Sequence, residues 1–320
     1  VNLSITCAQL KFVNNASVTM VRATSGTSTI TLSGEAGEDF VVEAGSSFSI
    51  IPATAGSLRF AMAAANTGRV SGTLSIITTQ QARFDNTTGG TAGAFRFTSG
   101  SSFTSNITST SSSYAFGSNS QSTEKWVVFE DGSNLYYEGG YSPIANNSTF
   151  TAIQFQPNSN YHHRANNGGG SFLNRRSFGN IFVENDATLT ADGPVYRINN
   201  LTINTGCGFV THTSGQTAVM GNLTVNGSFI SPAGSFNELI LCGSAAQNIS
   251  GAGTLTPAAV LIAANANVSL ARNISVENTA NIIGKINFGT SQLSGAGTFN
   301  AEGPAATATA TGNTITGSYV

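Results

Sequence analysis

Short segments in which apolar and polar residues alternate recur along the whole chain, and they constrain its fold more than any other feature. Ser or Thr alternates with Val, Ile or Leu in TSTITLSG (27–34) and in VSGTLSI (70–76), which is the period-two pattern of a strand with one buried face. Helical spacing is nearly absent, and Gly and Asn punctuate runs of β-branched residues. The sequence therefore predicts an all-β protein.

In the second half, the strand-like segments return at intervals of roughly 12 to 22 residues, the length scale of one solenoid coil. Segments this small cannot fold alone. A unit of strand, corner, strand and corner is typical of a parallel β-helix, whose coils stack about 4.8 Å apart. Right-handed winding is the default for parallel β connections. The expected strands begin at Ile181, Leu201, Leu223, Leu239, Val260, Ile274 and Ile286.

Aligning these segments predicts two apolar columns inside the coils. Residues between the two columns, such as Thr202, Thr224 and Ser275, would then point outward, and Asn204 and Asn226 would lie at corners. The first column holds Ile181, Leu201, Leu223, Leu239 and Ile274, and the second holds Val183, Ile203, Val225, Leu241 and Val276.

The pentapeptide SGAGT occurs twice, at 250–254 and at 294–298, followed each time by an apolar residue. Its residues carry no strongly reactive group, so the repeat indicates a rule about shape. We expect a tight corner of small residues before a strand resumes, with two or three coils between the two copies.

Composition excludes several classes of partner. Charged residues make up 9% of the chain, against roughly 25% in ordinary soluble domains, and neutral polar surfaces of this kind are common outside the cell. The net charge of −2 offers no basic field for nucleic acid or anionic lipid. No apolar run approaches the roughly 20 residues that cross a bilayer, and Val1 opens into strand-like sequence, as expected if a secretion signal has been removed. We therefore expect an extracellular or outer cell surface location.

The three cysteines, Cys7, Cys207 and Cys242, are far apart and lack CxxC spacing. They predict neither a disulfide framework nor a zinc site. Three small buried side chains are expected, with a bridge between Cys207 and Cys242 as the alternative.

The ordered series SFGNIFVENDATLTADGP, NLTIN, GNLTVNGSF and AAQNISGAGTL resembles the repetitive β-helical regions of large secreted surface proteins of Bacteroidetes, which are typically cargo of the type IX secretion system. The resemblance covers at least 150–299. Members of this group usually carry a C-terminal sorting domain, which is not seen here, so the resemblance implies one part of a longer polypeptide. It implies no particular activity.

The composition divides the expected β-helix into three sections of one continuous domain. Regular coils are expected over 1–83 and 181–320, and wider or less regular coils over 84–180, because more than half of the aromatic residues fall between Phe84 and Phe182.

WVVFEDGSNLYYEGGYSP (126–143) concentrates aromatic residues beside carboxylates. Proteins grip sugar rings with such groups, by stacking and by hydrogen bonds to hydroxyls, which makes Trp126, Tyr136, Tyr137 and Tyr141 candidates for ligand binding. The alternative is that aromatic residues fill a broad interior. We favour that alternative for Trp126 and Phe129 and leave it open for Tyr137 and Tyr141.

NYHHRANNGGGSFLNRRSFGN (160–180) is the only basic concentration in the chain. His162, His163, Arg164, Arg175 and Arg176 would suit an acidic sugar, or would supply the base of a β-elimination lyase. In the structural alternative, which we favour, the arginines pair with carboxylates or carbonyls at coil corners. Adjacent histidines on a strand point to opposite faces, so only one of them can serve a given site.

GEAGEDF (34–40) is the densest acidic cluster, with Glu35, Glu38 and Asp39 on a glycine-rich loop and Glu43 beyond. Oxygen-rich loops can hold Ca²⁺, yet this spacing matches no known calcium repeat, and a solvated turn is the preferred interpretation. We expect no cofactor and no catalytic centre, because no catalytic motif is present and ionisable groups are scarce.

Three functions of different classes follow. The first is a non-catalytic structural or adhesive element; the second is a glycan-binding module centred on 126–176; the third is a β-helix polysaccharide lyase. Expected partners are surface glycans or other surface and secretion proteins, and open strand edges would permit end-to-end self-association. The candidate ligand-binding residues are Trp126, Tyr136, Tyr137, Tyr141, His163, Arg164, Arg175 and Arg176.

Overall fold

The structure is a computed structural model, and its described residues contain strands and no helix. The strand pairs are parallel, as in β4 with β7 and β17 with β19. The prediction of an all-β parallel solenoid is therefore confirmed. The described residues are 3–22, 26–34, 37–52, 56–63, 65–86, 91–109, 114–117, 125–144, 152–174, 176–193, 196–295, 298–301, 307–310 and 318–319.

The chain forms two compact units, which we call unit 1 (Val1–Phe172) and unit 2 (Leu173–Val320). The division falls inside the section 84–180 that was expected to hold wider coils. Each unit is described by itself below.

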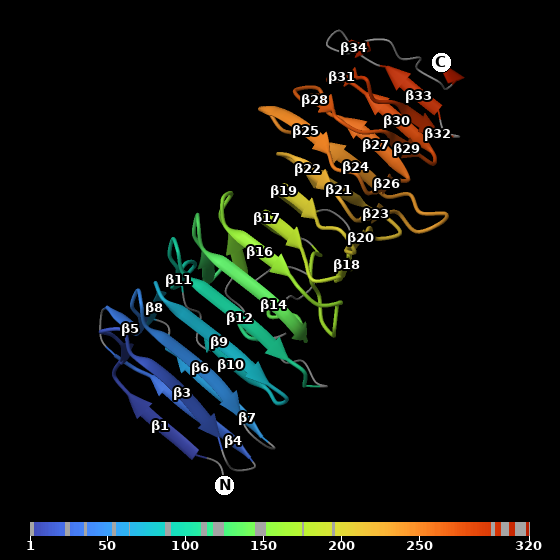
Figure 1. The fold of residues 1–320 in the computed structure, drawn as a ribbon. Helices are drawn as coiled ribbons and strands as arrows, with labels where there is room; N and C mark the ends of the chain where they lie inside the picture. The colour runs from blue at the N-terminus through green and yellow to red at the C-terminus, as the bar shows by residue number, and fades with distance from the viewer. Residues whose placement is uncertain are drawn as a thin grey trace. The chain divides into compact units, whose positions relative to one another are not determined.

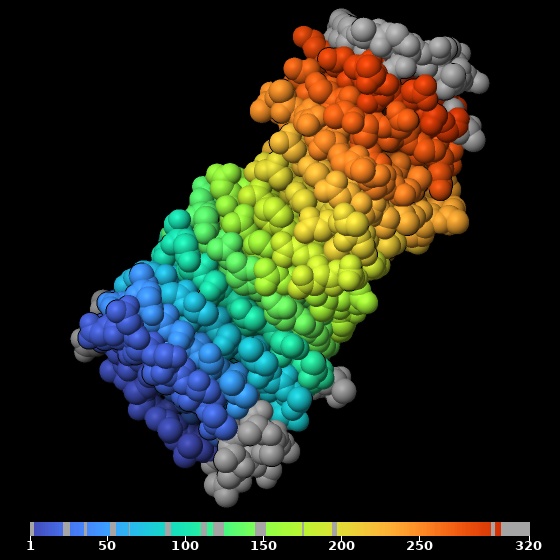
Figure 2. Space-filling view, viewed as in Figure 1, coloured from blue at the N-terminus to red at the C-terminus, as the bar shows by residue number. Residues whose placement is uncertain are grey.

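The coils of unit 1 build three parallel sheets, and each of the first four coils contributes one strand to every sheet. Figure 1 shows the third sheet as consecutive arrows in blue to green, and the colours in Figure 2 follow the same order along this unit. Phe116 and Ile144 continue the first sheet as single bridges. The first sheet contains β1 (Leu3–Cys7), β4 (Thr27–Leu32), β7 (Ser57–Met62) and β10 (Ala82–Asn86). The second contains β2 (Leu10–Phe12), β5 (Glu38–Val42), β8 (Thr67–Val70), β11 (Phe95–Phe97), β13 (Val127–Phe129) and β15 (Ile153–Phe155). The third contains β3 (Ser17–Arg22), β6 (Ser47–Pro52), β9 (Thr73–Thr78), β12 (Ser102–Ile107), β14 (Asn134–Gly140) and β16 (Asn160–His163).

A four-residue turn joins the second sheet to the third, and a small residue at its end faces inward. In the turn 130–133, Gly132 has a φ of 78°, and the Ser133 N–H donates to the Glu130 carbonyl at 3.0 Å. The Ser133 hydroxyl donates to the same carbonyl at 2.6 Å, so its burial leaves no polar atom unpaired. In unit 1 the small buried residue at the end of this turn is Ser46, Ser101, Ser133 or Ser159. In unit 2 a small buried residue also ends turns that join other strands, at Ala187, Cys207, Ser235 and Ala266.

Phenylalanine side chains from all three sheets fill the core of unit 1. Phe60 stacks on Phe84 with ring centroids 4.7 Å apart, and Phe97 stacks on Phe129 at 4.3 Å. Rings of this size require wide coils, and the hydrogen-bonded pair Ser17 and Ser47 is 30 positions apart. The aromatic-rich segment thus supplies the interior, as favoured above for Phe129.

Unit 2 has narrower coils, and one of its strands divides in two. β17 (Ser177–Val183) pairs with β19 (Tyr196–Ile203), and β19 pairs in the next coil with both β21 (Gln216–Val219) and β22 (Leu223–Val225). The divided pattern continues through β24 (Glu238–Leu241), β25 (Ala246–Ser250), β27 (Ala259–Ile262), β28 (Asn267–Leu270), β30 (Thr279–Ile282), β31 (Lys285–Gly289), β33 (Thr298–Ala301), β34 (Thr307–Ala310) and β35 (Ser318–Tyr319). A second sheet holds β18 (Thr188–Thr190), β20 (Gly208–Val210), β23 (Ser228–Ile230) and β26 (Thr254–Thr256), and β29 (Ile274–Val276) pairs with β32 (Leu293–Gly295).

The predicted interior positions of unit 2 are confirmed, but the predicted columns are only partly right. Leu201, Leu223 and Leu239 are all fully buried, and Leu201 lies opposite Leu223. Leu239 instead lies opposite Thr217 and Val260. Ile274 also leaves the predicted column, because β29 pairs with β32. The alignment failed because β19 pairs with two strands of the next coil, β21 and β22. The residues of a single strand do not indicate such a division.

The SGAGT repeat marks close approaches between coils. A Cβ on Gly251 would lie 2.2 Å from the Val225 carbonyl oxygen, and one on Gly295 would lie 1.8 Å from that of Val276. Both glycines have positive φ, so a residue with a side chain would be strained there as well. The first copy begins at the last residue of β25 and the second begins within β32. In both copies the first glycine lies too close to a neighbouring carbonyl to carry a side chain.

The three cysteines are free in the structure, and Cys207 is buried. The bridge between Cys207 and Cys242 is therefore not formed. No helix that could span a membrane occurs among the residues that the structure describes.

Candidate functional site

Three of the predicted ligand-binding side chains lie in the core of unit 1. Trp126, Tyr137 and His163 have no exposed surface. The Trp126 ring meets the edge of Phe95 at 6.0 Å, and Tyr137 stacks on His163 at 4.9 Å. A ligand at the surface cannot touch these rings, so their assignment to a binding site is corrected. Alternation along β14 and β16 is the cause, because it turns Tyr137 and His163 inward.

The buried side chain of Tyr137 has a structural role, because its hydroxyl hydrogen-bonds two backbone segments. Its hydroxyl donates to the Gly140 carbonyl at 2.6 Å and accepts the Gly168 N–H at 3.0 Å. Burial raises the pKa of this phenol to about 12, and the hydrogen bond from Gly168 lowers it by a smaller amount. Tyr137 therefore stays protonated near neutral pH and ties the end of β14 to the segment that follows β16.

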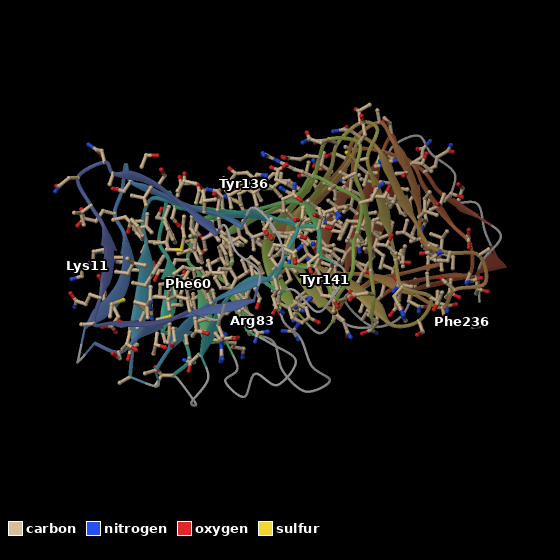
Figure 3. The ribbon with its side chains drawn as sticks, turned by 90° about the horizontal axis from the view of Figure 1, so that it is seen from below. Lys11, Phe60, Arg83, Tyr136, Tyr141 and Phe236 are labelled. Atoms are coloured by element: carbon tan, nitrogen blue, oxygen red, sulfur yellow. The ribbon has the colours of Figure 1, made fainter. Side chains whose placement is uncertain are left out.

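Tyr141 is half-buried against a glycine run, at some distance from Tyr136 in Figure 3. Its ring meets Tyr114 edge-on at 5.2 Å. A Cβ on Gly169 or Gly170 would lie 2.4 or 2.6 Å from carbons of this ring. Gly169 and Gly170 therefore make room for an aromatic side chain, and Tyr141 is better described as a packing residue than as an open platform.

The basic segment does not form one surface group. Arg164 belongs to unit 1, whereas Arg176 belongs to unit 2, where its side chain is buried. Arg175 lies outside the described residues. The prediction that Arg176 contributes to a surface site is corrected on this ground, because its guanidinium is enclosed by protein.

Three side chains of the third sheet and Arg164, which follows β16, gather on the outer face of unit 1, and we call them the Tyr136 cluster: Tyr136, Glu138, His162 and Arg164. Tyr136 and His162 are register partners on β14 and β16, and their rings stack at 4.6 Å. The Arg164 guanidinium carbon lies 4.3 Å from the Tyr136 ring centroid. Arg164 Nη1 lies 3.0 Å from Glu138 Oε1. All four side chains are partly exposed.

The opposite side of Tyr136 has a smaller neighbour. Thr104 on β12 is the register partner of Tyr136 in the preceding coil, and among the described residues no ring stacks on Tyr136 from that side. The sequence did not predict that Thr104 lies opposite Tyr136, because the number of residues in a coil differs from one coil to the next. The cluster thus presents an aromatic ring, a hydroxyl and a fixed ion pair, the combination that stacks on a sugar ring and binds its hydroxyls.

The described carboxylates of the acidic segment do not converge on one another. Glu38 pairs with Arg69, whose Nε lies 2.8 Å from Oε1. A register shift between Glu38 and Phe40 accompanies the burial of Asp39, and burial raises the pKa of that carboxyl. Glu35 lies outside the described residues. No group of three or more His, Cys, Asp or Glu side chains that could hold a metal ion occurs in the part of the chain that the structure describes.

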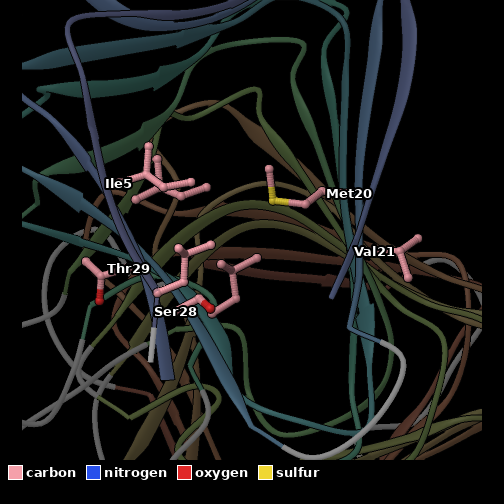
Figure 4. Close-up of a pocket in the computed structure, with 8 residues that line it drawn as sticks. Ile5, Met20, Val21, Ser28 and Thr29 are labelled. Atoms are coloured by element: carbon pink, nitrogen blue, oxygen red, sulfur yellow. The ribbon is translucent and has the colours of Figure 1, made fainter. Parts of the chain in front are cut away.

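An apolar pocket of about 190 Å³ lies between the first and third sheets at the first coils of unit 1 (Figure 4). Leu3, Ile5, Met20 and Val21 line it together with Ser28 and Thr29. The lining side chains carry no charge, so the pocket offers little to orient a polar ligand.

We compared the chain with family models, curated proteins and solved structures, and none of the three comparisons found a match.

Proposed function

We propose that the protein is a non-catalytic extracellular adhesive element, a β-solenoid scaffold that presents a carbohydrate-binding face at the Tyr136 cluster. One observation carries the proposal: the Tyr136 ring is held on the outer face between His162 and Thr104, beside the Arg164–Glu138 ion pair. A sugar ring would stack on the side of Tyr136 that faces Thr104, while hydroxyls would bind the guanidinium and the carboxylate.

The scaffold supports this role by holding the ring in place before a ligand arrives. Tyr136 lies in a parallel ladder, and Arg164 and His162 both contact its ring, so little side-chain freedom remains to be lost on binding. Side-chain ladders run between the coils. Ser47 donates to Ser17 at 3.0 Å in unit 1, and Asn200 donates to Asn180 at 2.8 Å in unit 2. Because these hydrogen bonds join successive coils, they restrict the motion of one coil against the next. A rigid scaffold of this kind is suited to an adhesive element.

A location outside the cell is supported by the low charge content of 9%, and by the resemblance to β-helical surface proteins of Bacteroidetes. As part of the same proposal, export would use the type IX system and the partners would be surface glycans. A lyase is the weaker candidate, because the Glu138 carboxylate is already paired with Arg164 and a catalytic base needs a free position near the substrate.

The test is glycan binding by the full chain and by two variants. Tyr136→Ala should weaken the binding of the neutral glycans found in a screen about tenfold, because the stacking platform is lost. Arg164→Gln should weaken it to a smaller degree. The matched control is Arg96→Gln, since Arg96 forms a similar surface ion pair with Glu130 at 2.7 Å on the second sheet. Binding that survives Tyr136→Ala unchanged would contradict the proposal.

The same glycan panel tests the absence of catalysis. We expect no release of reducing or unsaturated ends during prolonged incubation. Release that disappears in Glu138→Gln or Glu130→Gln would show turnover and would replace the adhesive role with an enzymatic one.

A further inference from the structure

Two arginines and one aspartate meet on the outer face of the first sheet of unit 1. Arg59 on β7 and Arg83 on β10 are register partners, so their side chains are neighbours in the ladder. Arg59 Nε lies 2.8 Å from Asp85 Oδ2, and Arg83 Nε lies 2.6 Å from the same oxygen. Arg83 is labelled in Figure 3.

The charges of this group do not balance. The Asp85 side chain is 3% exposed, and its carboxylate faces two guanidinium groups. Among the residues that the structure describes, one positive charge of this group is therefore left over. Three other ion pairs of unit 1 each join one arginine to one carboxylate: Arg69 with Glu38, Arg96 with Glu130, and Arg164 with Glu138.

The Nε atoms of Arg59 and Arg83 are buried against Asp85, and neither makes an aligned hydrogen bond within the part of the chain that the structure describes. A ligand would therefore have to bind the other nitrogens of the two guanidinium groups. The Arg59 side chain is 32% exposed and that of Arg83 is 22% exposed. Like charges directly opposite each other in a ladder repel, and a single carboxylate offsets only part of this repulsion.

We propose that Arg59 and Arg83 form a binding site for one carboxylate, that of a uronic acid in an acidic polysaccharide. Asp85 positions the two guanidinium groups, and the bound carboxylate supplies the missing negative charge. Guanidinium groups bind carboxylates through paired, charge-assisted hydrogen bonds, which a lysine cannot reproduce. The choice of a polysaccharide as the source of the carboxylate rests on the proposed carbohydrate-binding function, whereas the oxyanion site rests only on Arg59, Arg83 and Asp85.

The experiment compares trigalacturonate with its methyl ester, which has the same rings without the charges. Calorimetry on the full chain should show at least about tenfold tighter binding of the acid. Arg59→Gln and Arg83→Gln should each abolish most of this preference. Arg69→Gln is the matched control and should keep it, because Arg69 lies on the neighbouring β8 strand and is balanced by Glu38. An unchanged preference in both Arg59→Gln and Arg83→Gln would overturn the proposal.

A second measurement covers the case in which these variants fold poorly. In the wild-type chain, trigalacturonate should shift the NMR signals of the Arg59 and Arg83 Nε–H groups and leave that of Arg69 in place. Absence of these shifts at saturating ligand would overturn the site. Shifts caused by dextran sulfate but not by trigalacturonate would overturn the assignment to a carboxylate.

The two proposals fail in different ways. If Tyr136→Ala leaves neutral glycan binding intact while trigalacturonate still shifts Arg59 and Arg83, the Tyr136 cluster is wrong and the oxyanion site stands. If Tyr136→Ala abolishes binding of the methyl ester while the acid shows no preference over it, the oxyanion site is wrong and the proposed function stands.

Discussion

The Arg272 guanidinium donates a hydrogen bond to the Val225 carbonyl at 2.8 Å, although 47 positions separate the two residues in sequence. Its second terminal nitrogen donates to the Gly253 carbonyl, and Nε donates to Asn273 at 3.3 Å. Val225, Gly253 and Arg272 belong to three successive coils, because β22 pairs with β25 and β25 with β28. One side chain therefore joins three coils of unit 2 at their corners.

Replacing Arg272 by Met should destabilise unit 2 by about 1–3 kcal/mol, because two partly buried carbonyls lose a charged donor. Arg272→Lys should recover only part of the loss, since one ammonium cannot reach both carbonyls in the fork geometry. Urea denaturation followed by circular dichroism measures the difference. Equal stability of wild type and Arg272→Met would show that solvent replaces these bonds without cost.

Substitutions at two adjacent residues of β22 can test which of its side chains face the interior of unit 2. Val225 is fully buried, so Val225→Asp should cost several kcal/mol, because an unpaired carboxylate would be enclosed in an apolar core. Thr224→Asp is the control, since Thr224 points outward beside Ser250, and it should change stability by less than about 1 kcal/mol. Thermal melting of the two variants gives the comparison, and similar melting temperatures would contradict the assigned faces.

Substitutions at two glycines can distinguish the free-energy cost of a steric contact from the cost of an unfavourable backbone conformation. Gly234 has a φ of 71° with open space around its Cβ position, whereas a Cβ on Gly251 would meet the Val225 carbonyl at 2.2 Å. Gly234→Ala should cost about 1 kcal/mol from φ alone. Gly251→Ala should cost roughly 2–4 kcal/mol, because neighbouring coils must also move apart. Chemical denaturation gives both values, and equal costs would mean that the coils separate freely.

Tyr137 should make the stability of unit 1 depend on alkaline pH. Its pKa is raised by burial to about 12 from the ordinary value of 10.0, so the unfolded chain releases this proton first. The stabilisation is therefore complete below pH 10 and is lost between pH 10 and about 12. Urea midpoints at pH 9 and pH 11.5 should fall more in wild type than in Tyr137→Phe. A fall of the same size in both proteins would exclude Tyr137 as its source.

Local pattern was enough to predict which side chains of a strand face inward. The alternation of apolar residues placed Leu201, Leu223 and Val225 inside and Thr224 outside, as the structure confirms. This inference succeeds because facing direction depends on neighbouring residues of the same strand.

Tertiary structure decided most of the contacts between residues of different coils, although the alignment of strands did place Leu201 opposite Leu223. The contacts of Asp85 with Arg59, of Tyr136 with His162 and of Arg272 with Val225 each join residues of different coils. Coil length varies with the turns between strands, so a partner's position cannot be counted from sequence, and a shift of one residue would turn each side chain to the other face. The sequence by itself therefore determined the strands and their buried faces, whereas coil length and register determined the Tyr136 cluster and the arginine pair.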